Sequence, residues 1–388
     1  MADHKNKKTR IPKTSTKVKT GAEAAGELFI GLGEQSFAAV FFFTSGDYDL
    51  VELGRSLSTF YPDIPIYGCT SAGVIGVSGY EEDSVSAFAL PASHFHVDAD
   101  VIGDISTIDI SAWGEATKNL VDRFESNVTG PLKDQTFGLV LIDGLSLAEE
   151  TILSAVYPEL GDIPLFGGSA GDDLKFKKTQ IFFNSEAISN CAALILVHTT
   201  CPFQVFRTEH FVETDRKMVI TEADPASRIV HEINASPATE EYARLIGVQP
   251  DELNSTLFAA HPVMVRVGGA YYVRSIQKPE GEDGLRFFCA IDEGLVLTLA
   301  KGQDIVTNLK HTLQDVDKAV GDPELIIGCD CIFRRLELEQ TPEKYDQVSD
   351  ILREHNVFGF NTYGEQFAGM HVNQTFTGVA IGWRDSDD

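Results

Sequence analysis

The stretch Ile163-Pro164-Leu165-Phe166-Gly167-Gly168-Ser169-Ala170-Gly171-Asp172-Asp173 has the pattern of a buried strand that runs into a glycine-rich turn. Glycine has no side chain and tolerates positive φ, so such a turn brings bare backbone close to another group. A weaker copy occurs earlier in the chain, as Ile64-Pro65-Ile66-Tyr67-Gly68-Cys69-Thr70-Ser71-Ala72-Gly73. Two copies of one pattern predict a duplicated structural unit.

Each copy follows an apolar, strand-like run and then a segment with helical periodicity; the strand-like runs are Val40 to Phe43 and Leu139 to Ile142. The N-terminal half is therefore predicted to be a duplicated strand–helix–strand–turn unit. The character of the sequence changes near residues 200–215, and Gly268-Gly269 then separates two strand-like runs, as in a hairpin. We expect an α+β protein: a duplicated strand–helix N-terminal sheet domain and a second, sheet-rich α+β domain.

The composition excludes several classes of protein. With 388 residues and a net charge of −27, the body of the chain would repel nucleic-acid phosphates. Six cysteines are too few for a disulfide framework in a chain of this length, and no apolar run approaches the ~18 residues of a membrane span. The N-terminus also lacks the apolar core of a signal peptide. These features predict a cytoplasmic protein, and they leave a homo-oligomer possible.

Residues 1–20 are polar and basic, with almost nothing to bury. This composition predicts a disordered tail. The tail could be a solvated terminus or an electrostatic contact for an anionic partner.

Four motifs in order resemble the FIST (F-box and intracellular signal transduction) family: Gly-Gly-Ser-Ala-Gly-Asp-Asp, Asp292-Glu293-Gly294, Tyr363-Gly364-Glu365 and His371-Val372-Asn373-Gln374-Thr375. The resemblance covers roughly residues 25 to 383. It implies a FIST N-terminal domain over 21–205, a FIST C-terminal domain over 206–384, and a ligand-sensing role in signalling. Within the family, the segments around His210 and His261 are similar to the nitric-oxide-sensing haem proteins that act on a partner histidine kinase.

That narrower resemblance implies a haem b whose iron is held by His210 or His261. Haem iron in a gas sensor needs a neutral imidazole in an apolar pocket. His210 has Phe211 beside it, and His261 lies in an apolar run before a proline. No Cys-x-x-Cys-His motif occurs, so any haem would be non-covalent. The alternatives are a histidine paired beside Glu209 and a core histidine.

Two arginines and the glycine turn could hold an anionic group. Arg266 and Arg274 could bind haem propionates or, in the general family, an amino-acid-like ligand, because an arginine fork binds carboxylates bidentately. Ordinary ion pairs would equally explain both arginines. The backbone N–H groups of Gly167 and Gly168 and the hydroxyl of Ser169 could bind a carboxylate, or could form only a tight turn.

An enzymatic role is not expected, because the chain lacks the usual catalytic motifs. It has no G-x-S-x-G elbow, P-loop or His-Glu-x-x-His sequence. Ser169, His371 and Glu365 could be combined into a triad, but nothing in their spacing supports one. The prediction is a haem-based nitric oxide sensor acting on a histidine kinase, with a haem-free, amino-acid-binding sensory module as the alternative.

Overall fold

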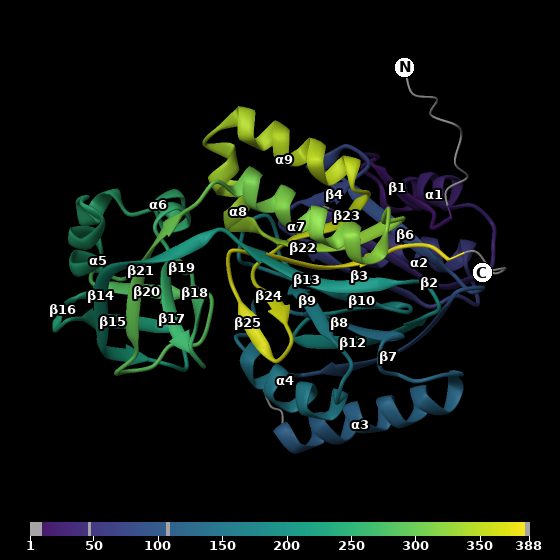
Figure 1. Ribbon diagram of the computed structural model, residues 1–388, viewed down its shortest axis with the longest axis horizontal. Coiled ribbons are helices and arrows are strands. Elements are labelled where there is room, and N and C mark those ends of the chain that lie inside the picture. Colours follow the sequence, from purple (N-terminus) through teal and green to yellow (C-terminus); the bar gives the residue numbers. More distant parts are fainter. Residues whose placement is uncertain (1–9, 46–47, 106–108, 385–388) are drawn as a thin grey trace.

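The computed structural model describes residues 10–45, 48–105 and 109–384 and confirms the α+β class. Within these residues, three six-stranded sheets form a body, and an eight-stranded sheet forms a separate unit at its side (Figure 1). The body contains the predicted repeat three times, one copy more than the sequence indicated. We call the copies the first, second and third repeat, and the separate unit the inserted unit.

The repeats share one order of elements: edge strand, helix, strand, helix, strand, hairpin, closing strand. The first repeat contains β1 (Lys13–Thr16), α1 (Gly21–Leu32), β2 (Phe37–Ser45), α2 (Leu50–Phe60), β3 (Ile66–Ser71), β4 (Val74–Gly76), β5 (Gly79–Glu81) and β6 (Val85–Pro91). The second contains β7 (Phe95–Gly103), α3 (Ile110–Asn127), β8 (Thr136–Ile142), α4 (Glu149–Val156), β9 (Leu165–Ser169), β10 (Ile181–Phe183), β11 (Glu186–Ile188) and β12 (Cys191–Thr199).

The third repeat is interrupted after its edge strand. It contains β13 (Phe203–Glu209) and then, after the insertion, α7 (Ile305–Val320), β22 (Leu325–Cys331), α8 (Ile332–Glu339), α9 (Pro342–Glu354), β23 (Val357–Thr362), β24 (Glu365–Phe367), β25 (Met370–Val372) and β26 (Thr375–Ile381). The inserted unit, residues 211–302, contains β14 (Phe211–Asp224), β15 (Ile229–Ile233), β16 (Ser236–Pro237), α5 (Ala238–Ile246), α6 (Ser255–Ala260), β17 (Val263–Val267), β18 (Ala270–Arg274), β19 (Ile276–Glu280), β20 (Gly284–Phe287) and β21 (Val296–Gly302). The hairpin predicted around Gly268-Gly269 is confirmed as β17–β18.

Each repeat lends its hairpin to the sheet of another repeat. Strand β4 of the first repeat pairs with β23 of the third, β24 of the third pairs with β9 of the second, and β10 of the second pairs with β3 of the first. The exchange is therefore cyclic. It gives the body a pseudo-three-fold arrangement and places the hairpin β24–β25 beside the second repeat.

The three sheets of the body enclose one apolar core and carry helices on their outer faces. Phe43 of the first repeat stacks on Phe360 of the third at 4.5 Å between ring centroids. Separate apolar clusters join α1 and α2 to the first sheet, α3 and α4 to the second, and α7 and α9 to the third. The rule that a sheet must cover both apolar faces explains this layered arrangement.

One glycine recurs at the same place in all three repeats, and close approach explains it. Gly68, Gly167 and Gly359 lie opposite Phe42, Val140 and Gly328 in the parallel strand pairs. A Cβ at any of the three would collide with the carbonyl oxygen of that opposite residue. The third copy was missed in the sequence because its turn, Thr362-Tyr363-Gly364, is poorer in glycine.

The prediction of a disordered tail is wrong for residues 13–20. Lys13 to Thr16 pair with β6, and Thr20 caps helix α1 by accepting a hydrogen bond from the N–H of Glu23. Lys13 donates to the carbonyl oxygen of Glu324 at 2.7 Å, and burial lowers its pKa to about 8. Free backbone groups at the edge of a sheet recruit even a polar segment as a strand. Residues 1–9 lie outside the described part of the chain.

Candidate functional site

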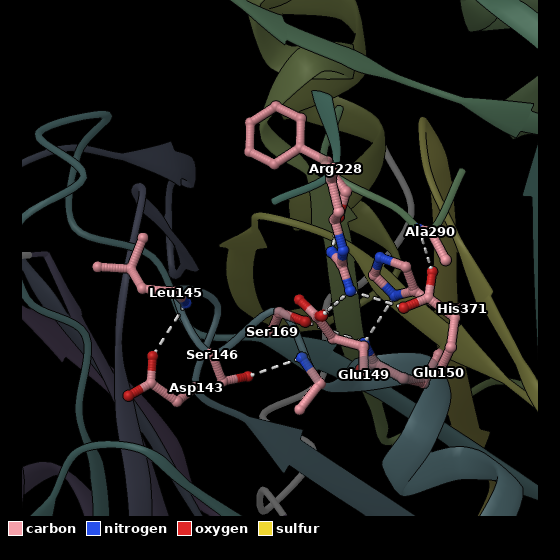
Figure 2. Close-up of polar contacts among 12 residues, drawn as sticks. Asp143, Leu145, Ser146, Glu149, Glu150, Ser169, Arg228, Ala290 and His371 are labelled. Carbon is pink, nitrogen blue, oxygen red and sulfur yellow. Dashed lines mark hydrogen bonds and ion pairs between the residues drawn. The ribbon is translucent and has the colours of Figure 1, made fainter. Parts of the chain in front are cut away.

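The inserted unit meets the body at a buried polar junction beside α4 and the β24–β25 hairpin (Figure 2). Arg228 of the inserted unit donates from Nη2 to Glu149 Oε2 and to Glu150 Oε2, each at 2.7 Å. The backbone N–H of Ala290 donates to Glu150 Oε1, also at 2.7 Å. The junction is thus pinned by charged groups, of which Arg228 and Glu149 are almost wholly buried.

The position of the two carboxylates follows from the start of α4. Glu149 and Glu150 occupy the first turn of this helix, where the positive end of the helix dipole favours acidic side chains. Burial opposes the ionisation of Glu150, but His371, Arg228 and the Ala290 N–H together lower its pKa below the ordinary value. Burial likewise opposes the charge on Arg228, and its two glutamate partners raise its pKa.

A second arginine of the inserted unit reaches the hairpin. Arg274 is 8% exposed and donates from Nη1 to the carbonyl oxygen of His371 at 3.2 Å. The neighbouring N–H of Ser275 donates to Asn373 Oδ1 at 3.2 Å. Unlike Arg228, Arg274 forms no ion pair with any carboxylate in the described part of the chain. A buried guanidinium without a counter-ion is unfavourable, so it indicates a place for an anion.

Polar atoms without a protein partner occur in the residues that hydrogen bonds link across this junction. Within the part of the chain that the structure describes, six buried atoms of this region have no hydrogen-bond partner: Arg274 Nε, Ser275 Oγ, Gln366 Oε1, His371 Nε2, Asn373 Nδ2 and Gln374 Oε1. Buried polar groups in folded proteins are nearly always satisfied, so a concentration of unsatisfied ones marks a site for bound water or ligand. We call these six residues the junction cluster.

The proton positions make the cluster rich in donors. Gln366 donates from Nε2 to Ser169 Oγ at 3.0 Å and lies 3.3 Å from His371 Nδ1. In the neutral imidazole Nδ1 accepts from this amide and the proton lies on Nε2, and in the charged imidazole Nε2 also carries a proton. In either form Nε2 is a donor without a protein partner. Arg274 Nε and Asn373 Nδ2 can only donate. These three donors suit an anionic oxygen pair such as a carboxylate, whereas the free oxygens of Gln366 and Gln374 can only accept and suit a donor group of the same ligand.

Ser169 and Arg274 are the two predicted residues that the structure brings to this junction. Ser169 is wholly buried and linked through Gln366 to His371, which holds Arg274. Because Gln366 bonds both Ser169 and His371, no hydrogen bond runs from Ser169 to the imidazole. The hypothetical triad of Ser169, His371 and Glu365 therefore lacks its central contact.

The geometry of His210 does not fit an iron ligand. Its imidazole is fully buried between two side chains of α8: Arg334 Nη1 lies 3.0 Å from Nδ1, and Glu337 Oε2 lies 2.7 Å from Nε2. Arginine can only donate, so Nδ1 accepts and Nε2 donates. Burial lowers the pKa of His210, although Glu337 opposes that shift. Both ring nitrogens therefore have a protein partner. This agrees with the alternative of a paired histidine, with Glu337 rather than Glu209 as its carboxylate partner.

The other predicted residues are spread over the inserted unit and the sheet interior. Phe211 packs on His210 at 4.2 Å, and Arg266 is exposed on the β17–β18 hairpin. His261 ends α6, where it is half-buried and burial lowers the pKa of its imidazole. Gly167 and Gly168 lie inside β9, opposite Gln366 and Glu365 of β24. Neither glycine forms an open anion-binding turn.

Arg228, Glu149 and Glu150 were not predicted from the sequence as site residues. Arg228 pairs with Glu149 and Glu150, which lie 79 and 78 positions before it in the chain. No local sequence pattern predicts a pairing over such a separation. Cys289 was also missed; it is wholly buried at the junction, where burial, Glu149 and Glu150 raise its pKa to about 11 although Arg274 and Arg228 lower it. Besides Ser169 and Arg274, the His371-to-Thr375 motif is the sequence feature that falls at this junction.

An open cavity of about 350 Å³ lies at the equivalent place in the first repeat, lined by Gly73, Glu82, Asp83 and Arg335 among others. By sheet register, Glu82 corresponds to Asn373 and Asp83 to Gln374. There, however, Arg335 is paired with Glu82 and Glu339. The first-repeat cavity has its charges satisfied, whereas the junction cluster does not.

Among residues 10–45, 48–105 and 109–384, no group of three or more His, Cys, Asp or Glu side chains is placed to hold a metal ion. Over the same ranges, every helix is too short or too polar to cross a membrane.

Both halves of the chain match a known family of protein domains. Residues 38–236 match the FIST N domain, and residues 238–368 match the FIST C domain. An uncharacterized protein of Methanocaldococcus jannaschii, MJ1623, is 24% identical over 425 residues, covering 96% of this chain and 80% of that protein. Arg228 falls in the first domain match and Arg274 in the second.

Proposed function

Because this chain belongs to the FIST family, with both a FIST N and a FIST C domain, we propose that it is a cytoplasmic sensory module for an amino-acid-like molecule. FIST domains act as sensory modules in signal transduction, and the proposed ligand site is the junction cluster. The ligand would contact the body and the inserted unit together, so its binding would act on both parts.

The observation that carries this proposal is the unpaired, buried guanidinium of Arg274. Its Nη1 donates to the carbonyl oxygen of His371, and Arg274 Nε, His371 Nε2 and Asn373 Nδ2 are donors without a protein partner among the described residues. A carboxylate would supply the missing counter-charge and accept from these donors. The Glu149–Glu150 pair at the same junction would favour an ammonium group at the other end of the ligand.

A ligand screen with matched probes tests the proposal. Free L-amino acids and their carboxamides are compared by thermal shift, and hits are measured by calorimetry. We expect some acids to bind and their amides to bind much more weakly, since the amide lacks the negative charge. A ligand at 100 times its Kd should add about 2.7 kcal/mol of stability.

Two arginine variants locate the binding. Arg274→Gln should weaken binding roughly 30-fold or more, because a buried charge-assisted contact is lost. Arg266→Gln removes an exposed arginine from the same hairpin and should bind like the wild type. No binding by any acid, or equal binding by both variants, would contradict the proposal.

The haem alternative, a nitric oxide sensor acting on a histidine kinase, rests on His261, since His210 has no free nitrogen. His261 is a half-buried imidazole at the end of α6, and its backbone carbonyl is held by Tyr242 Oη at 2.6 Å. Reconstitution with haem b and an absorption spectrum test it. A Soret band that nitric oxide shifts, and that His261→Ala removes while His210→Ala does not, would favour this alternative over the amino-acid sensor.

A further inference from the structure

The inserted unit is joined to the body at one place only. The chain leaves the body between Glu209 of β13 and Phe211 of β14, and it returns between Gly302 of β21 and Ile305 of α7. The two crossings lie side by side, because the N–H of Gln303 donates to the carbonyl oxygen of His210 at 2.6 Å. Two adjacent crossings are the geometry of a hinge.

His210 fastens this hinge to the body. It lies between the last body strand and the first inserted strand, and its imidazole is held by Arg334 and Glu337 of α8. Arg334 is itself anchored by Asp330 at 2.7 Å, and Asp330 accepts from Tyr80 of the first repeat. We call the contact of His210 with Arg334 and Glu337 the latch.

The two sides of the junction differ in character. Near α8 the contact is apolar: Phe288 of the inserted unit packs against Phe333 at 5.4 Å and Tyr363 at 5.9 Å between ring centroids. Near α4 and the β24–β25 hairpin it is polar and contains the junction cluster. Figure 1 shows α6 beside α8, and the hairpin and α4 further along the same face of the body. Separation at the polar side breaks the contacts of Arg228 with Glu149 and Glu150 rather than this aromatic packing.

A ligand cannot reach the junction cluster while the two parts are in contact. Arg274 and Ser275 belong to the inserted unit, His371 and Asn373 belong to the body, and the last three are 2% exposed or less. Entry therefore requires the parts to move apart.

We propose that the inserted unit is a hinged lid over the junction cluster, turning at His210 and Gln303, where the latch restrains the hinge, and held closed on its polar side by the contacts of Arg228 with Glu149 and Glu150. The identity of the ligand rests on the proposed function, whereas opening of the lid is measured without any ligand. The two can therefore fail separately.

Opening of the lid can be measured by how fast the thiol of Cys289 is labelled. Among the described residues all six cysteines are buried and free: Cys69, Cys191, Cys201, Cys289, Cys329 and Cys331. Cys289 lies in the inserted unit at the junction, whereas the other five lie in the body. The full-length protein is incubated with iodoacetamide, and labelling of each cysteine is followed by mass spectrometry. In the wild type, Cys289 should react at least ~10-fold faster than Cys329, which lies in the core of the body, because a partial opening needs less free energy than global unfolding.

Two variants on one helix test the latch. Glu337→Ala removes the acceptor of His210 and should speed labelling of Cys289 about 10-fold, with the body cysteines unchanged. Glu339→Ala removes a partner of Arg335 on the same helix and should change labelling of Cys289 less than about 2-fold. Wild-type Cys289 reacting no faster than Cys329, or Glu337→Ala leaving Cys289 unchanged, overturns the lid. If Glu337→Ala instead unfolds the protein, the ratio of the labelling rates of Cys289 and Cys329 in the wild type still tests the lid.

Discussion

Arg228→Met is expected to lower the free energy of unfolding by about 4 kcal/mol. The substitution leaves Glu149, whose side chain is 3% exposed, as a buried carboxylate without its cation. Glu150 and the carbonyl oxygen of Phe288 lose the same donor. Removing one member of a buried ion pair costs more than removing both, because the remaining charge cannot return to water. Urea denaturation followed by circular dichroism measures the change.

Two comparisons test whether the loss of stability comes from the burial of this ion pair or from the loss of an arginine charge alone. Arg123→Met removes an arginine with two carboxylate partners, Asp98 at 2.7 Å and Asp100 at 3.1 Å, but its side chain is 44% exposed. This control should lose no more than about 1 kcal/mol, as exposed pairs do. The double variant Arg228→Met with Glu149→Gln should recover part of the loss. Equal losses for Arg228 and Arg123 would show that the junction pair is not the buried anchor described here.

Glu365→Gln is expected to remove a pH-dependent loss of stability on the order of 4 kcal/mol. Burial raises the pKa of Glu365 from 4.5 to about 8, although hydrogen bonds from Thr362 and Thr375 oppose the shift. Below pH 4.5 the carboxyl is protonated in both the folded and the unfolded chain. As the pH rises towards 8, the unfolded chain releases the proton and the folded chain keeps it, so stability falls until the pH passes about 8.

The amide can keep the contacts of the carboxyl without its charge. Its oxygen can accept from the N–H and hydroxyl of Thr375, and its NH₂ can donate to the Thr362 hydroxyl, which rotates. Stability curves from pH 4 to 9 should therefore diverge, with the variant increasingly the more stable. Glu343→Gln, an exposed substitution on α9, should follow the wild type. Parallel curves for Glu365→Gln and the wild type would show that this carboxyl ionises as freely in the fold as in the unfolded chain.

Particular residues show which features of this protein can be predicted from its sequence and which cannot. The turn at Gly167 was found because a strand followed by glycines is a local signal, and its copy at Gly68 established a repeat. The third copy, around Gly359, lacks the glycine run and was missed. The apolar neighbour Phe211 favoured His210 as an iron ligand, but the partners of its imidazole, Arg334 and Glu337, lie on a helix more than 120 positions away.

The amino-acid sequence by itself determined the α+β class, the repeated strand–helix–turn unit, the β17–β18 hairpin and the family resemblance, because periodicity, turn residues and ordered motifs are properties of neighbouring residues. Only the tertiary structure decided that Arg228 meets Glu149, that Arg274 lies unpaired against His371, and that Ser169 is tied to Gln366. These pairs lie 79, 97 and 197 positions apart. Charge pairing and burial depend on which distant surfaces the fold brings together, and here that was settled by the cyclic exchange of hairpins and the docking of the inserted unit.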